Sequence, residues 1–242
     1  MQYNNETRAT ISPNDRKLPK AQQVILAVIL FGYPLISWLL NYINPPSETV
    51  IQSRISQVYI PAILIQTLVF LVIIWATTKT ADGQINLSNI AGIGIKPKDF
   101  NLLNLAIGIM FLFTALIILN IISNIIDYYG IFRAEDITYL LPRSPEEKVF
   151  WIMLSLIAGV TEELCFRGFV ITRLAILTGS VWPGAILGAV SFGLGHLYQG
   201  WAGVAVIGIY GLLFSLLFIA RGSLVPCIIA HALQDILAAF VV

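Results

Sequence analysis

Long apolar runs are the feature of this chain that most limits what it can fold into. Seven stretches are nearly free of charge, and most approach the about 20 residues that a helix needs to cross a bilayer. They lie at 21–40, 58–77, 102–126, 149–170, 185–197, 203–220 and 224–242. Backbone polar groups in hydrocarbon must be satisfied internally, and continuous apolar runs of this length do so as helices. The sequence therefore predicts an all-α, polytopic transmembrane bundle of about seven to eight helices.

Composition supports a membrane protein and argues against nucleic-acid binding. Of the 242 residues, 57% are hydrophobic and 11% charged, whereas soluble domains carry about 25% charged residues. The formal net charge of +1 gives no basic surface for a polyanion. The first apolar run exceeds the core of a signal peptide, so we expect a retained span. Membrane lipid is the expected environment, and no nucleic-acid partner is expected.

The chain divides into three parts on this pattern. Residues 1–20 form a polar tail, 21–148 the leading transmembrane helices and loops, and 149–242 a trailing transmembrane core. Polar residues of the leading spans are scattered amides such as Gln66 and Asn104. Ionisable residues, in contrast, lie inside the trailing spans, where they are costly and usually functional. We therefore expect the chemistry after Val149.

Positive charges in the connectors predict the orientation. With the amino terminus inside, the inner segments hold ten Lys and Arg residues and the outer ones four, in agreement with the excess found in cytoplasmic loops. The expected location is a bacterial-type plasma membrane, with a thylakoid or other internal membrane as the alternative. The amino terminus is expected in the cytoplasm.

The fourth apolar run carries two adjacent acids and an arginine. Glu163 and Arg167 are four residues apart, so on a helix they share a face and can form an ion pair. Glu162 points about 100° away and is left as a candidate general base. The structural alternatives are an ion pair at the end of a span and a Glu162 side chain that reaches the inner interface.

The two histidines of the chain, His196 and His231, lie in later apolar runs. His231 and Asp235 are four apart and project from one helical face. If these three side chains converge with Glu162, they provide a base, polarising groups and nitrogen and oxygen ligands for a metal. The structural alternative is hydrogen bonding between helices. Cys165 is expected to be a packed thiol and not a nucleophile, because its surroundings are electronegative.

Helical rise gives an expected depth for these groups. At about 1.5 Å per residue, Glu162 and His231 each lie about 10 Å from the inner face, and His196 about 15–20 Å. Glu162 and His231 have the same expected depth near the inner face. Since hydrolysis needs water at the site, this predicts a polar cavity that opens toward the cytoplasm.

Three short motifs follow one another in the trailing runs, each within a span and about thirty residues from the next. They are EExxxR at Glu162, Glu163 and Arg167, FxxxH at Phe192 and His196, and HxxxN/D at His231 and Asp235. Together they resemble the CAAX protease and bacteriocin-processing (CPBP, or Abi) family of intramembrane endopeptidases. The resemblance covers about 149–242 and does not extend to the leading spans.

The resemblance implies an endopeptidase in which Glu162 activates water with the help of His196. His231 and Asp235 would then stabilise the oxyanion or hold the substrate. Supporting positions would be those of Phe192, Glu163 and Arg167, with Arg167 bracing Glu163. The implied substrate is a membrane-associated protein or peptide, which in the eukaryotic branch carries a lipid.

Zinc and metal-free versions of this chemistry both remain open. Asp235 stands where the eukaryotic prenyl-protein proteases of the family have Asn, and a carboxylate adds one candidate ligand. A zinc ion would be held by the four candidate catalytic residues, Glu162, His196, His231 and Asp235. In the metal-free version Glu162 activates the water without a metal ion.

Two other functions compete with proteolysis. A non-catalytic membrane adaptor, or a bacteriocin-immunity-type protein, would keep the fold without the reaction. A small ion- or proton-coupled transporter would use the carboxylates and histidines as a path for the ion. The second is less well supported, because no inverted repeat is visible and the polar groups concentrate in the trailing spans.

Overall fold

The computed structural model describes residues 17–43, 51–79, 86, 88–132 and 134–240. Most of the tail expected at 1–20 lies outside these residues. Seven apolar helical segments are present in the described ranges, five of them long enough to cross a membrane and two shorter. The predicted all-α transmembrane bundle is confirmed, and each expected span corresponds to one helical segment.

The leading part contains three long segments. The first comprises α2 (Lys20–Ala27), a π-helical stretch (Val28–Gly32) and α3 (Tyr33–Ile43). The second begins with a π-helical turn (Ile55–Tyr59) and continues as α4 (Ile60–Thr78). After a short α5 (Asn89–Gly92) and a 3₁₀ turn (Pro97–Asp99), α6 spans Leu102–Tyr129.

The trailing part begins, after a 3₁₀ turn (Thr138–Leu140), with α7 (Pro145–Glu163), which passes without a break through a π-helical segment (Leu164–Ile171) into α8 (Thr172–Thr178). It continues with α9 (Trp182–Gly195), a 3₁₀ turn (Leu197–Gln199), α10 (Gly200–Arg221) and α11 (Val225–Ala238). A capping box between Ser144 and Glu147 starts α7, which satisfies backbone donors that a helix start leaves open.

The fourth span is the one whose end was predicted wrongly. It was expected to end near residue 170, but the helix continues to Thr178 and is 34 residues long. Arg167 and Arg173 suggested a membrane surface, yet both are buried. Glu162 therefore lies 16 residues before the helix end, about 24 Å at 1.5 Å per residue. Glu162 lies near the middle of this helix, whereas the expected depth of about 10 Å was counted from a span end near residue 170 and stays a prediction.

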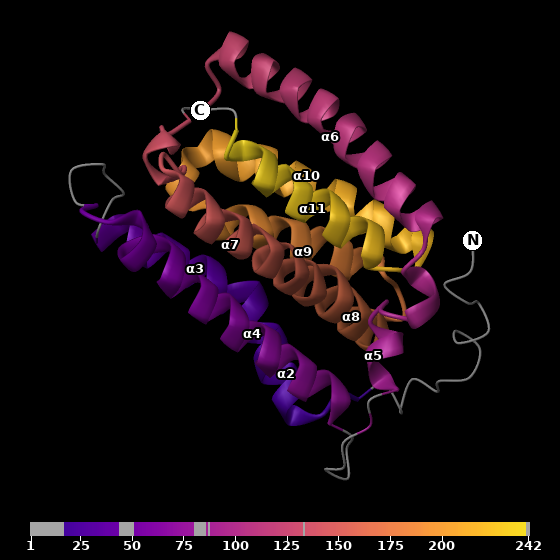
Figure 1. Ribbon diagram of the computed structural model, residues 1–242. Helices are drawn as coiled ribbons and strands as arrows, with labels where there is room; N and C mark the ends of the chain where they lie inside the picture. The colour runs from indigo at the N-terminus through magenta and orange to yellow at the C-terminus, as the bar shows by residue number, and fades with distance from the viewer. Residues whose placement is uncertain (1–16, 44–50, 80–85, 87, 133, 241–242) are drawn as a thin grey trace.

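Helices of the trailing part form the centre of the bundle. In Figure 1, α7, α9, α10 and α11 lie between the α2–α4 layer along one edge and α6 along the opposite edge. Contacts follow the same order: α4 packs on α7, α3 packs on α9, and α6 packs on α11 and α10. Both the candidate acids and the candidate histidines are thus carried by central helices.

Close backbone contacts set the spacing between these central helices. A Cβ atom added at Gly159 of α7 would lie 3.0 Å from the backbone nitrogen of Ala232 in α11. At Gly193 of α9 it would lie 2.6 Å from the carbonyl oxygen of Val204 in α10. Small residues allow such approach in membranes. Since Ala232 follows His231, the first contact brings His231 close to the Glu162–Glu163 segment.

Candidate active site

The Glu163–Arg167 pair expected from helical spacing is present and fully buried. Arg167 Nη1 donates to Glu163 Oε1 at 2.8 Å, with 1% and 0% of the two side chains exposed. Arg167 Nη2 also donates to the carbonyl oxygen of Gly211 in α10 at 3.1 Å. Its guanidinium lies 4.7 Å from the ring centre of Phe192 and 5.0 Å from that of Phe214. Aromatic faces attract a cation in this arrangement, so Arg167 is held from several sides.

Glu163 has a second partner that sequence spacing did not indicate. Nδ1 of His231 donates to Oε1 of Glu163 at 2.8 Å, and the ring of Phe214 stacks on the imidazole with centroids 5.5 Å apart. Glu163 and His231 are 68 residues apart in the chain. Glu163 therefore connects Arg167 to the histidine of the last helix, and it fixes the orientation of that ring.

Glu162 and Asp235 both face the other nitrogen of His231. The distance from His231 Nε2 to Glu162 Oε2 is 3.7 Å, and that to Asp235 Oδ2 is also 3.7 Å. Side-chain exposure is 15% for Glu162, 8% for His231 and 31% for Asp235. The structure thus brings together residues from two trailing helices, as expected. Asp235 is the most exposed of the three.

His196 joins this cluster through Phe192. Its Nδ1 donates to the carbonyl oxygen of Phe192 at 2.8 Å, so Nε2 of the neutral ring is available as an acceptor. The Phe192 ring packs edge-on against His196, with centroids 4.7 Å apart, and lies 6.1 Å from His231. The four-residue spacing of the FxxxH motif therefore has a structural role, because it places a carbonyl and a ring against one imidazole.

One further residue reaches the cluster from a leading helix. Gln66 of α4 donates from Nε2 to Oε1 of Glu162 at 2.6 Å. Thr161 Oγ1 donates in turn to the backbone oxygen of Gln66 at 3.3 Å. Gln66 was one of the scattered amides of the leading spans, and an amide in hydrocarbon needs a partner. That cost is the only signal in the sequence that could have marked this residue.

Two other side chains considered as nucleophiles take part in packing. Cys165 is a buried free thiol. Ser191 Oγ donates to the carbonyl oxygen of Ile29 at 2.7 Å, which ties α9 to the first span. Neither side chain is placed as a nucleophile. For Cys165 this agrees with the expectation of a packed thiol.

A metal ion does not fit the donors in the arrangement shown. Among the described residues, no group of three or more His, Cys, Asp or Glu side chains has a geometry that could hold one. The reaction steps below therefore use the protein's own side chains, and zinc dependence stays a prediction to be measured.

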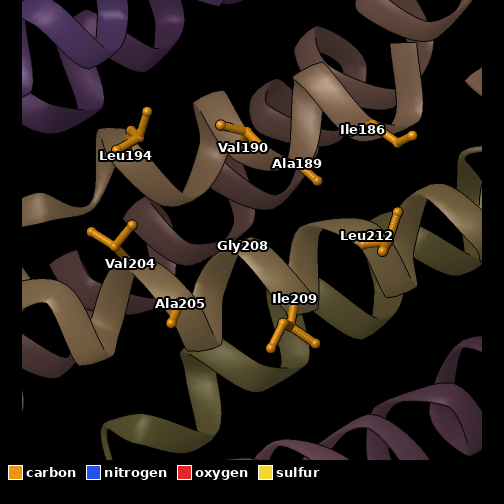
Figure 2. Close-up of a pocket in the computed structure, with 9 residues that line it drawn as sticks. All are labelled: Ile186, Ala189, Val190, Leu194, Val204, Ala205, Gly208, Ile209 and Leu212. Carbon is orange, nitrogen blue, oxygen red and sulfur yellow. The ribbon is translucent and has the colours of Figure 1, made fainter. Parts of the chain in front are cut away.

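An apolar groove lies away from these groups. It is a groove of about 310 Å³ between α9 and α10, and Figure 2 shows its lining side chains. Its nine lining residues are aliphatic residues and one glycine, among them Ala189, Leu194 and Ile209. A hydrolytic site needs polar groups, so this groove is not the active site.

Comparison with protein families identifies the trailing part. Residues 144–237 match the family model described as type II CAAX prenyl endopeptidase Rce1-like. This segment is a CAAX endopeptidase-like domain. The match confirms the family resemblance of the three motifs, all of which lie within it. No curated protein and no solved structure matches the chain.

The CAAX endopeptidase-like domain comprises α7 to α11 and starts at the N-cap residue of α7, Ser144. It contains Glu162, Glu163 and both histidines. Gln66 lies outside it, because the match begins at residue 144. The protein is thus an integral membrane protein in which the matched segment packs against helices that the family model does not describe.

Proposed function

We propose that this protein is an intramembrane endopeptidase that hydrolyses a peptide bond in a membrane-associated protein or peptide, lipidated or not. One observation carries the proposal: Glu162 Oε2 and Asp235 Oδ2 each lie 3.7 Å from His231 Nε2. This arrangement is the centre of the proposed site. It supplies a carboxylate base beside a polarising group inside a membrane bundle. The family of the trailing domain is one of proteases of this kind.

Glu162 acts as the general base in this proposal. Its Oε1 is engaged by Gln66, which leaves Oε2 to take a proton from a water molecule. The water oxygen then forms a bond to the carbonyl carbon of the substrate. As the carbon–nitrogen bond breaks, the proton held by Glu162 passes to the leaving nitrogen, which gives a carboxylic acid and an amine; the acid then transfers its proton to the amine, so that the final products are a carboxylate and an ammonium group.

His231, with a proton on both ring nitrogens, stabilises the charge that develops on the carbonyl oxygen, and His196, whose Nε2 is an acceptor, helps Glu162 by orienting the attacking water. Both rings pack against Phe192, and each uses Nδ1 for a fixed contact within the protein. Their Nε2 atoms are therefore the ones available to the reaction. Preorganised groups of this type lower the barrier without reorganisation. Asp235, the most exposed member, contacts the substrate.

We also propose a bacterial-type plasma membrane with the amino terminus in the cytoplasm. The orientation is supported by the Lys and Arg residues: once the buried Arg167 and Arg173 are set aside, eight fall in the inner segments and four in the outer ones. In this orientation Lys79 and Arg221 lie at cytoplasmic ends of α4 and α10. A cysteine introduced next to Lys79 is then expected to be labelled by an impermeant reagent in inverted vesicles and not in intact cells.

Substitution of either histidine is expected to lower cleavage strongly. His196→Ala and His231→Ala should each reduce kcat by about 10²- to 10³-fold, the usual effect of losing one preorganised group of the reactive cluster. The assay uses purified protein in liposomes with membrane-anchored peptides, half of them lipidated, and detects products by mass spectrometry. Leu237→Ala, at an exposed position of α11, is the matched control. Full activity in both histidine variants would contradict the proposed roles.

Chelation is expected to leave cleavage unchanged. Because no described side chains form a group with metal-binding geometry, protein dialysed against a chelator should keep its kcat within about two-fold. The measurement compares dialysed protein with and without added zinc. Loss of activity on chelation, with recovery on zinc addition, would instead establish the zinc-assisted version with ligands among Glu162, His196, His231 and Asp235.

A further inference from the structure

The second span contributes to the reactive cluster although it lies outside the CAAX endopeptidase-like domain. α4 packs along α7, and its Gln66 meets Glu162 from a position 96 residues earlier in the chain. Two bonds join the helices at this level, one from Gln66 Nε2 to Glu162 and one from Thr161 Oγ1 to the Gln66 backbone. This double attachment fixes Gln66 relative to the acid that follows Thr161.

The two oxygens of Glu162 have different surroundings. Oε1 accepts the hydrogen bond from Gln66 at 2.6 Å, whereas Oε2 lies 3.7 Å from His231 Nε2. Titratable groups near Glu162 come from several elements: His231 and Asp235 of α11, Cys165 of the π-helical segment after α7, Tyr33 of α3, His196 at the end of α9 and Tyr198 of the following turn. Within the described part of the chain, the contact with Gln66 is the one that reaches Glu162 at hydrogen-bond distance. It decides which oxygen is left for chemistry.

The nature of the Gln66 side chain agrees with this role. α4 otherwise presents mostly apolar residues, with a mean hydropathy of 2.4 in its span, and an amide there is costly unless it is hydrogen-bonded. Hydrogen bonds to a carboxylate are about twice as strong as those between neutral groups. An apolar residue would serve better for spanning the membrane, so the amide is explained by its contact with Glu162.

We propose that Gln66 is a positioning residue that orients the carboxylate of Glu162. It holds Oε1 so that Oε2 faces the reacting water and His231, and α4 thereby completes the active site. The proposal rests on the proposed endopeptidase function for its effect on rate. The hydrogen bond itself is independent of that function and can be measured separately.

Three variants test the proposal by kinetics. Gln66→Met keeps the length of the side chain but lacks the donor, and we expect kcat to fall about 10- to 100-fold with KM within about two-fold. Gln66→Glu places a second carboxylate against Glu162, and its kcat should fall further. The control is Thr67→Val, the neighbouring exposed position of α4, with activity equal to that of the wild type.

Infrared difference spectroscopy of the full-length protein provides the second measurement. Subtraction of the Glu162→Gln spectrum isolates the carboxylate bands of Glu162, and loss of the Gln66 donor should shift them. Unshifted bands in Gln66→Met would overturn the contact whether or not the protein cleaves peptides. Shifted bands with wild-type kcat in a cleaving enzyme would overturn the positioning role. Absence of cleavage by the wild type would instead refute the proposed function.

A purely structural role for Gln66 predicts a different pattern. In that case Gln66→Met, which fills the same space with an apolar chain, would leave kcat unchanged and would lower thermal stability at most slightly. The kinetic loss at constant KM, combined with a wild-type melting temperature in detergent, is therefore the result that supports positioning.

Discussion

Peptide cleavage is expected to fall by about 10²- to 10⁴-fold when Glu162 is replaced by Gln, the range by which general bases accelerate reactions. The amide keeps the shape of the side chain but cannot take a proton from water. Because Glu162 is near the middle of a continuous helix and is 15% exposed, we expect no change in folding. The measurement is product formation in liposomes, together with the melting temperature of the purified variant.

The control for this variant is Glu146→Gln at the start of the same helix, where the side chain is exposed and kcat should be unchanged. A Glu162→Gln protein with wild-type kcat would exclude Glu162 as the base. If the wild-type protein cleaves no peptide and Glu162→Gln preserves its cellular phenotype, a non-catalytic adaptor would account for both results. Ion flux that depends on Glu162 would point to a transporter.

Loss of the Arg167 charge is expected to produce the largest change in stability. In Arg167→Met, Glu163 remains at 0% exposure without its cation, and breaking a buried pair in this way costs about 3–5 kcal/mol. Arg167→Lys should be intermediate, because a single ammonium group does not reproduce the fork that contacts both Glu163 and Gly211. Denaturant unfolding in detergent micelles measures the difference.

A double-mutant cycle separates the pair from the rest of the site. Arg167→Met combined with Glu163→Gln removes both charges, so the double variant should recover part of the stability that Arg167→Met loses. It should not recover activity, because Glu163 also accepts the hydrogen bond from His231 Nδ1. Equal stability of wild type and Arg167→Met would show that the buried pair does not hold this part of the bundle together.

Interactions within one helix could be predicted from the sequence. Apolar runs predicted the spans, because the bilayer sets the length of apolar helix that is needed. The Glu163–Arg167 pair and the shared face of His231 and Asp235 followed from four-residue spacing, and both are present. The end of the fourth span was wrong for a specific reason: Arg167 and Arg173 are buried by neighbouring helices, and composition alone does not show such burial.

Contacts between helices were decided only by the tertiary structure. Convergence of Glu162 with His231 was a hypothesis until packing at Gly159 and Ala232 brought α7 against α11. The bond from His231 to Glu163 and that from Gln66 to Glu162 join residues 68 and 96 positions apart. Helix periodicity relates residues on one helix, but the rotation and approach of two helices depend on all the side chains between them. The sequence by itself therefore determined the spans and the reactive residue types, and the packing of α4, α7 and α11 decided which oxygen of which acid is available for chemistry.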